Sequence, residues 1–136
     1  GAASNVDGKV KFKISTEKSY LSKGGKIDRD GFEINSYTLD NLFYGKLDKP
    51  LKAIKIDTEG EDYNVLKGSE ELINEYKPKI IIEVREENKQ DIQNFLFKYN
   101  YKIFNIENLN EEINLEKIKI DNISNVFAKW FKNKKL

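Results

Sequence analysis

Hydrophobic and polar positions alternate in the first part of the chain and predict its elements. In residues 9–15 and 32–37, apolar and polar side chains alternate, which predicts two strands paired as a hairpin, each with one solvated face. The polar stretch 16–31 between them repeats Gly, Ser and Asp and predicts a long loop. Thr38 is a suitable cap for a short helix that ends near Phe43.

The middle of the chain predicts a strand, helical segments and a second strand. Residues 53–56 form a short apolar run, and residues 57–60, Asp-Thr-Glu-Gly, favour a turn directly after it. Residues 79–84 are a nearly unbroken β-branched run, which is typical of a strand covered on both faces in a parallel sheet. The pattern therefore predicts a βαβ unit with a right-handed crossover.

The helical segments between these strands carry their own boundary signals. Gly60 suits a turn that needs positive φ, while Glu61 and Asp62 suit a solvated first helical turn. Gly68 suits the left-handed position that closes the first helix. Ser69 then suits the cap of a second helix, which the proline at position 78 stops.

The last third of the chain returns to the sheet. Apolar residues at helical spacing predict a helix over 90–99, and 101–106 predicts a strand. Residues 105–114 are polar and predict a loop, 118–120 predict either a short strand or a packed loop, and 124–131 predict the final strand.

Composition narrows the function classes. The 24 basic and 23 acidic residues give a net charge of +1, which argues against nucleic acid or an anionic membrane as a partner. No apolar run approaches a membrane span, so we expect a cytoplasmic protein. Cysteine and histidine are absent, which excludes thiol, imidazole and zinc-finger chemistry and leaves carboxylates, amines and hydroxyls. The length of 136 residues suits one domain, 1–136.

Three carboxylates follow the predicted parallel strands. Asp57 and Glu59 come after the first strand, and Glu83 lies at the end of the second. Ligands bind at this edge of such sheets, so we predict that these three carboxylates lie where a ligand would bind. In the alternative interpretation, Asp57 and Glu59 cap the next helix and Glu83 forms an ion pair within the fold.

The carboxylate oxygens of this acidic cluster also suit Mg²⁺ or Ca²⁺. Their spacing along the chain does not match an EF-hand loop, and we predict no metal site.

Several segments resemble one known family. The string KIDTEGEDYNVLKG, followed by KPKIIIEV, resembles the carboxyl-terminal half of the FkbM family of S-adenosylmethionine-dependent methyltransferases. In that family a strand ends in an Ile-Asp-x-Glu-Gly turn and a later strand ends in Glu. GAASNVDGKVKF and SYTLDNL resemble the segments that precede that turn. The order and spacing of these pieces make the match specific, and it runs from Gly1 to about Ile106.

The resemblance implies a fold class. We expect an α/β fold with part of a class I methyltransferase (Rossmann-like) sheet, strands 4-5-7-6 of the order 3-2-1-4-5-7-6, plus an amino-terminal β-hairpin. The acidic strand would then be an unpaired edge. We therefore expect the chain to form a homo-oligomer or to pair this edge with a preceding amino-terminal segment.

The resemblance also implies a function. We expect methyl transfer from S-adenosylmethionine to a hydroxyl or similar group of a small-molecule or sugar acceptor, with Asp57, Glu59 and Glu83 as catalytic residues. Ala3, Ser4 and Asp57 would contact the cofactor. The family's Gly-rich turn does not occur in this sequence, so we expect the chain alone to bind the cofactor weakly or not at all. The alternative is a non-catalytic binding or assembly module with the same fold.

Overall fold

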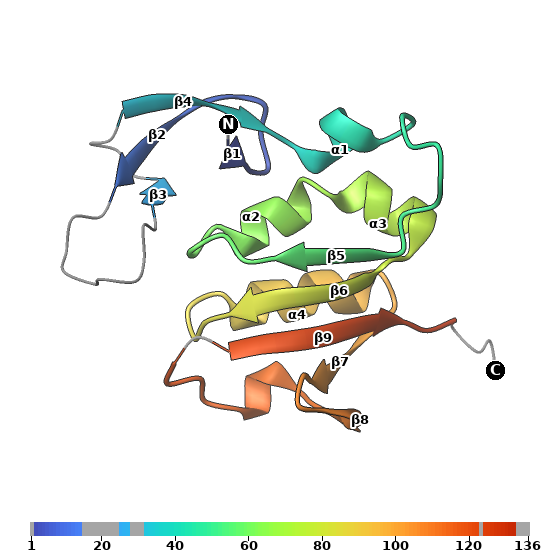
Figure 1. Cartoon of the computed structure of the whole chain (residues 1–136). Helices are drawn as coiled ribbons and strands as arrows, with labels where there is room; N and C mark the ends of the chain where they lie inside the picture. Colours follow the sequence, from blue (N-terminus) through green and yellow to red (C-terminus); the bar gives the residue numbers. More distant parts are fainter. Residues whose placement is uncertain (1, 15–24, 28–31, 123, 133–136) are drawn as a thin grey trace.

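Two β-sheets with short helices between and behind them make up the fold (Figure 1). The computed structural model describes residues 2–14, 25–27, 32–122 and 124–132. A small sheet near the amino terminus has the strand order β1-β4-β2-β3, and a larger sheet has the order β5-β6-β9-β7-β8. None of the helices in these described ranges has the length and apolar character needed to cross a lipid bilayer.

Each sheet is formed by a separate part of the chain. The small sheet and the helix after it contain β1 (Ala2–Ala3), β2 (Gly8–Ile14), β3 (Gly25–Ile27), β4 (Phe32–Tyr37) and α1 (Leu39–Phe43). The larger sheet and its helices contain β5 (Ala53–Ile56), α2 (Asp62–Lys67), α3 (Glu70–Tyr76), β6 (Lys79–Val84), α4 (Lys89–Lys98), β7 (Tyr101–Asn105), β8 (Asn108–Glu112), a 3₁₀ turn (Leu115–Lys117) and β9 (Ser124–Trp130).

Parallel and antiparallel pairs coexist in the larger sheet. β5 pairs in parallel with β6, so the predicted βαβ unit is confirmed. β9 lies between β6 and β7 and runs antiparallel to both. β5 lies at the edge of this sheet, as predicted for the acidic strand. Residues 118–120 follow the 3₁₀ turn as irregular chain, which is the packed-loop alternative.

The core lies between one face of the larger sheet and its helices. Ile80, Ile82 and Val84 of β6 are completely buried, as are Leu66 of α2 and Leu96 of α4. Each such side chain contributes roughly 1.5 to 3 kcal/mol relative to an exposed one. Figure 1 shows α4 behind β6 and no helix in front of it. The expectation that β6 is covered on both faces is therefore wrong for the described residues.

The predicted polar loop over 105–114 is also wrong, because it contains β8. All five residues of β8 are exposed, and the strand pairs antiparallel with β7. The amide of Glu107 donates to the Asn105 side chain at 3.0 Å, which stabilises the turn between the two strands. Neither face of β8 is buried, so no alternation of apolar residues marks it.

The hairpin predicted near the amino terminus is confirmed. β2 and β4 pair antiparallel, and Phe12 lies opposite Phe32. β3 lies inside the stretch predicted as a loop, so that prediction is wrong for 25–27, while 15–24 and 28–31 of the same stretch lie outside the described residues. β1 adds to the sheet in parallel with β4.

The small sheet contacts the helices through one close backbone approach. A Cβ atom on Gly68 would lie 2.1 Å from the carbonyl oxygen of Ser4. Gly68 has φ of −73°, so the predicted left-handed conformation is wrong, and the glycine is needed for space instead. The Ser69 hydroxyl donates to the Val65 carbonyl oxygen at 2.7 Å, and it makes no capping bond to α3, contrary to expectation.

The cap of α3 comes from a distant aspartate. The two carboxylate oxygens of Asp40 accept hydrogen bonds from the amides of Glu71 and Leu72, each at 2.9 Å. The amide of Asp40 itself donates to the carbonyl oxygen of Gly68. The cap predicted at Thr38 is confirmed, because its hydroxyl accepts from the amide of Asn41 at 3.0 Å. The start of α1 and the start of α3 are thus tied together.

We expect Gly68→Ala to lower the free energy of unfolding by roughly 1 to 3 kcal/mol, because the new methyl group overlaps backbone that cannot rotate away. Urea unfolding monitored by circular dichroism measures this. Gly60→Ala is the comparison and measures the cost of a positive φ without steric overlap, because Gly60 has φ of +99° and nothing lies within 4 Å of the new atom. An unchanged unfolding midpoint for Gly68→Ala would contradict the close approach.

We expect Asp40→Ala to cost about 0.5 to 2 kcal/mol, since two amides at the start of α3 lose their acceptor. Asp48→Ala is the matched control, because Asp48 is exposed and lies outside the helices. Thermal unfolding of both variants tests this, and equal melting temperatures would argue against the cap.

Candidate functional site at the carboxyl ends of β5 and β6

The register of β5 and β6 brings two of the predicted site residues together. Ile54 lies beside Ile80 and Ile56 beside Ile82. Continuing this register by one residue places Asp57 beside Glu83, where each strand ends. The predicted meeting of these two carboxylates at one edge of a parallel sheet is therefore confirmed, and it follows from pairing alone.

Glu83 is the buried member of the pair. The residue is 4% exposed, whereas Asp57 is exposed. Burial raises the pKa of Glu83 from its usual 4.5 to about 7, with further contributions from a hydrogen bond to Asp57 and from the charge of Asp62. A nearby Arg85 opposes this rise. The carboxyl of Glu83 therefore changes its protonation state near neutral pH.

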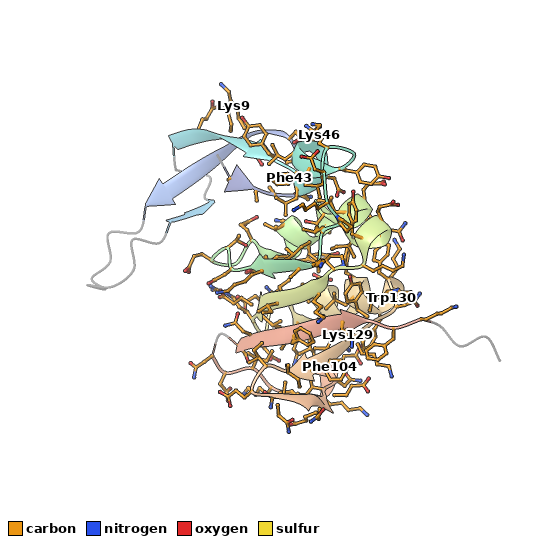
Figure 2. The ribbon with its side chains drawn as sticks, turned by 45° about the vertical axis from the view of Figure 1, so that its right-hand side comes forward. Lys9, Phe43, Lys46, Phe104, Lys129 and Trp130 are labelled. Atoms are coloured by element: carbon orange, nitrogen blue, oxygen red, sulfur yellow. The ribbon has the colours of Figure 1, made fainter. Side chains whose placement is uncertain are left out.

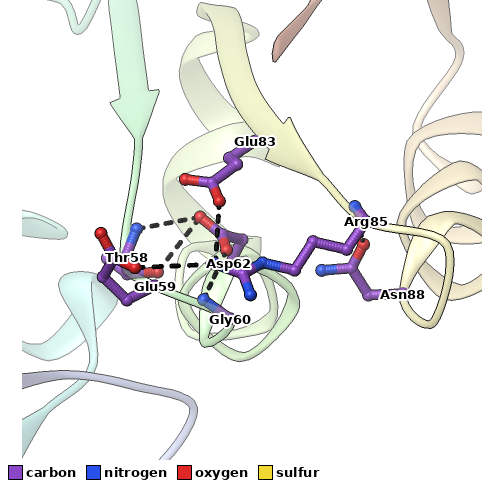
Figure 3. Close-up of polar contacts among 7 residues, drawn as sticks. All are labelled: Thr58, Glu59, Gly60, Asp62, Glu83, Arg85 and Asn88. Carbon is purple, nitrogen blue, oxygen red and sulfur yellow. Dashed lines mark hydrogen bonds and ion pairs between the residues drawn. The ribbon is translucent and has the colours of Figure 1, made fainter. Parts of the chain in front are cut away.

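Arg85 joins the site, although the sequence analysis gave it no role. Its Nη2 lies 3.1 Å from Oε1 of Glu83 and 3.7 Å from Oε2 of Glu59, so one guanidinium connects both carboxylates (Figure 3). The predicted ion pair of Glu83 within the fold is thus present together with the raised pKa. The sequence carried a signal for this contact, because Arg85 directly follows the strand and lies two residues after Glu83.

The turn after β5 is held by a carboxylate that was expected to be solvated. Asp62 is completely buried, and its carboxylate accepts hydrogen bonds from the amides of Thr58 at 3.0 Å and Gly60 at 3.2 Å (Figure 3). The solvated position predicted for Asp62 is therefore wrong. Asp62 thus binds backbone amides of the turn itself. The capping alternative for Asp57 and Glu59 concerned amides of the following helix, and the cap residue of that helix is Glu61, which makes no side-chain capping bond.

The tip of this turn has an unusual backbone conformation. Glu59 has φ of +52° and Gly60 has φ of +99°, and the amide of Glu61 donates to the Thr58 carbonyl oxygen. Two consecutive positive φ values are typical of a type I′ turn, and the left-handed conformation costs a residue with a Cβ about 1 to 2 kcal/mol. The Asp62 bonds and the Arg85 contact hold Glu59 there, with its side chain 54% exposed.

Two buried nitrogen atoms beside Glu83 lack a hydrogen-bond partner among the described residues. They are Nε of Arg85 and Nδ2 of Asn88. Asn88 is 9% exposed, and its Oδ1 accepts from the Arg85 amide at 2.8 Å, which fixes the orientation of its side chain. Figure 3 shows the amide nitrogen of Asn88 on the side of the guanidinium. Both groups can donate to an oxygen of a bound molecule.

A groove begins at Arg85 and runs along the loop before β9. Its volume is about 480 Å³, and its walls include Glu87, Ile120 and Asp121. Glu86 fixes this loop, because its carboxylate accepts from the Ile120 amide at 2.7 Å and pairs with Lys89 at 2.7 Å. These contacts lower the pKa of Glu86. Arg85 therefore lies between this groove and the carboxylate of Glu83.

The two remaining predicted residues lie in the small sheet. Ala3 packs against the core, and Ser4 is 3% exposed with its hydroxyl directed to Asn5 at 3.2 Å. Ser4 meets Gly68 at the junction of α2 and α3. Their proposed contact with a cofactor stays a prediction. Within the described residues, acidic side chains do not gather in threes in a geometry suited to a metal ion.

The chain matches one known protein family. The model of the methyltransferase FkbM domain matches residues 2–103, which include the acidic turn after β5, Glu83 and Arg85. Comparison with curated proteins finds no match, and comparison with solved structures finds none either. The family match extends over most of the sequence and agrees with the resemblance found in the acidic turn and in the strand that ends in Glu83. The chain belongs to the FkbM methyltransferase domain family.

Proposed function

We propose that this chain contributes to S-adenosylmethionine-dependent methyl transfer to a hydroxyl group, with Glu83 as the general base. One observation carries the proposal. Glu83 is a buried carboxyl with a pKa of about 7, beside Asp57, at the carboxyl ends of two parallel strands. A base is most effective when its pKa lies near the working pH.

The proton step follows from the chemistry of Glu83. The Glu83 carboxylate would accept the proton that the acceptor hydroxyl loses when it takes the methyl group, which bound S-adenosylmethionine would supply. Arg85 lies 3.1 Å from Glu83 and keeps part of the carboxylate population ionised near pH 7, because its charge opposes the rise in pKa. Asp57 and Asp62 act in the opposite direction and make the carboxylate a stronger base.

The residues around Asp57 fit a positively charged cofactor. S-adenosylmethionine supplies a methyl group on a cationic sulfur when it is bound. Asp57 and Glu59 are exposed carboxylates at the end of β5, and a cation there is favoured by their charge. Asp57 is the residue that we assign to cofactor contact, together with Ala3 and Ser4 from the small sheet.

The acceptor would lie in the groove beside Arg85. Arg85 lines this groove and contacts Glu83, so its guanidinium can hold an oxygen of the acceptor close to the carboxylate. Glu87 and Asp121 make the rim acidic, which disfavours an anionic acceptor and suits a neutral polyhydroxy compound. Binding there would hold a hydroxyl near Glu83, and alignment of this kind is the main source of rate in methyl transfer.

The sheet supports a class I methyltransferase relationship. We assign β5, β6, β9 and β7 to strands 4, 5, 7 and 6 of that fold, an assignment supported by their order in the sheet and by the antiparallel direction of β9. In this correspondence Asp57 follows strand 4 and Glu83 ends strand 5. Both positions lie at the edge where ligands bind in open α/β sheets.

Titration of Glu83 tests its role as a base. We expect its side-chain carbon, observed by ¹³C NMR, to titrate at about pH 7 in the folded chain. Asp57→Asn should lower this pKa, because the variant removes a neighbouring carboxyl, and Arg85→Gln should raise it. A Glu83 midpoint near 4.5, or shifts in the same direction for both variants, would contradict the proposed site.

The same pKa predicts a pH dependence of stability. The folded-state pKa of Glu83 exceeds 4.5, so its contribution to stability is complete below about pH 4.5 and is lost as pH rises through about 7. We expect Glu83→Gln to remove this decline between those pH values, while Glu75→Gln, on exposed α3 surface, leaves it unchanged. Urea unfolding at a series of pH values measures the difference.

Calorimetry tests the cofactor. We expect S-adenosylmethionine to give little heat with this chain and clear binding with a chimera that places the strand and Gly-rich turn of an FkbM methyltransferase before Gly1. Asp57→Asn in the chimera should weaken binding, whereas Glu75→Gln should not. A chimera that folds but binds no cofactor would contradict the proposal.

A further inference from the structure

The face of the larger sheet opposite the helices carries a row of lysines. Lys102 of β7 lies directly opposite Lys129 of β9. Ile80 lies opposite Ala128, so continuing that register by one residue places Lys79 of β6 opposite Lys129 on its other side. All three side chains are exposed. We call Lys79, Lys102 and Lys129 the lysine row.

Like charges directly opposite each other destabilise a sheet, so the lysine row needs a physical explanation. None of the three lysines forms an ion pair with a carboxylate in the part of the chain that the structure describes. Cation–π contacts with Phe131 stabilise two of these ammonium groups, because the centroid of its ring lies 4.7 Å from that of Lys102 and 5.6 Å from that of Lys129. The remaining charge faces solvent.

An apolar row lies next to the lysine row on the same face. Phe127 lies opposite Phe104 on one side and opposite Ile81 on the other. The rings of Phe104 and Phe127 are 6.3 Å apart, and those of Phe104 and Phe131 are 6.0 Å apart. All four side chains are only partly buried. Figure 2 labels Phe104 and Lys129 on neighbouring strands of this face.

The two rows together form a hollow surface. A groove of about 410 Å³ is lined by Phe104, Phe127 and Phe131, by Leu109, and by Lys79 and Lys129. Leu109 is 54% exposed beside it, although it is a large apolar residue. Surfaces that combine contiguous apolar side chains with a charged rim are typical of interaction sites.

We propose that this face binds an amphipathic helix whose apolar stripe is bordered by Asp and Glu. The apolar row would receive the stripe, and the acidic border would neutralise the lysine row. The rows are two residues apart along each strand, about 7 Å, so a single helix about 10 Å wide covers both. The surface is a face formed by three paired strands and offers no free edge there, so it suits a helix rather than an added strand.

A designed peptide pair tests the proposal. One peptide of about 18 residues carries Leu at helical spacing with Glu along its border, and the other has Lys in place of each Glu. We expect the acidic peptide to bind the full chain and to shift amide resonances of β6, β7 and β9 in NMR spectra. The lysine peptide should bind at least about tenfold more weakly. Equal binding of both peptides, or no binding of the acidic one, would overturn the proposal.

Charge reversal tests whether binding of the acidic peptide depends on the lysine row or only on the net charge of the chain. The triple variant Lys79→Glu, Lys102→Glu and Lys129→Glu should lose the acidic peptide and gain the lysine peptide. The matched control reverses three exposed lysines elsewhere, Lys46, Lys49 and Lys117, which form no ion pair within the described residues, and changes the net charge by the same amount. Loss of the acidic peptide in this control would overturn the proposal, because binding would then follow net charge alone.

Two further measurements distinguish other occupants. Sedimentation that shows a dimer abolished by the first triple variant would assign the face to a second copy of the chain. Tight binding of an oligo-dT strand, lost in that variant, would assign it to single-stranded nucleic acid, for which aromatic rings and lysines on a sheet are also suited. Either result would overturn the acidic helix as the occupant.

Discussion

Parallel pairing of β5 with β6, in the register that sets Ile56 beside Ile82, is the constraint on which the site depends. The pairing aligns the strand ends, so the backbone register alone makes Asp57 and Glu83 neighbours. The two carboxyls then share a small space, and burial of one of them raises its pKa. A shift of the register by one residue would turn Glu83 to the helical face and separate the pair.

The surroundings of Glu83 show how a buried carboxyl is made tolerable. Arg85 supplies an opposite charge at 3.1 Å, while Asp62 uses its own charge to hold the turn after β5. Asp62 satisfies two backbone amides, so its burial is compensated by hydrogen bonds. The site thus contains one carboxylate, Asp62, that is fixed by backbone donors, and another, Glu83, whose pKa lies near neutral pH.

Much of this arrangement could be predicted from the sequence, since apolar periodicity marks the strands and the turn residues mark their ends. The role of Asp62 could not, because a carboxylate in a first helical turn has the same sequence context whether it is solvated or buried. Arg85 was missed although its closer partner, Glu83, is only two residues away. Its second partner, Glu59, comes near it only when β5 pairs with β6. β8 was missed because a strand with no buried face has no apolar alternation.

The same limit explains the error at Gly68. Glycine at the end of a helix commonly adopts a left-handed conformation, and only the position of Ser4, far away in sequence, shows that space is the reason for it here. The two uncovered rows on the larger sheet are likewise invisible locally, because Lys79, Lys102 and Lys129 become neighbours only when three strands pair.

The cap that Asp40 provides to α3 has a consequence for how the molecule unfolds. The bonded groups lie 31 and 32 residues apart in sequence, so α3 gains its first-turn acceptor only when the segment after the small sheet is already in place. Separate melting of the two sheets would break this link, together with the Ser4 and Gly68 packing. We therefore expect the small sheet and the helical layer to unfold together, with loosening of either exposing amides in the other to hydrogen exchange.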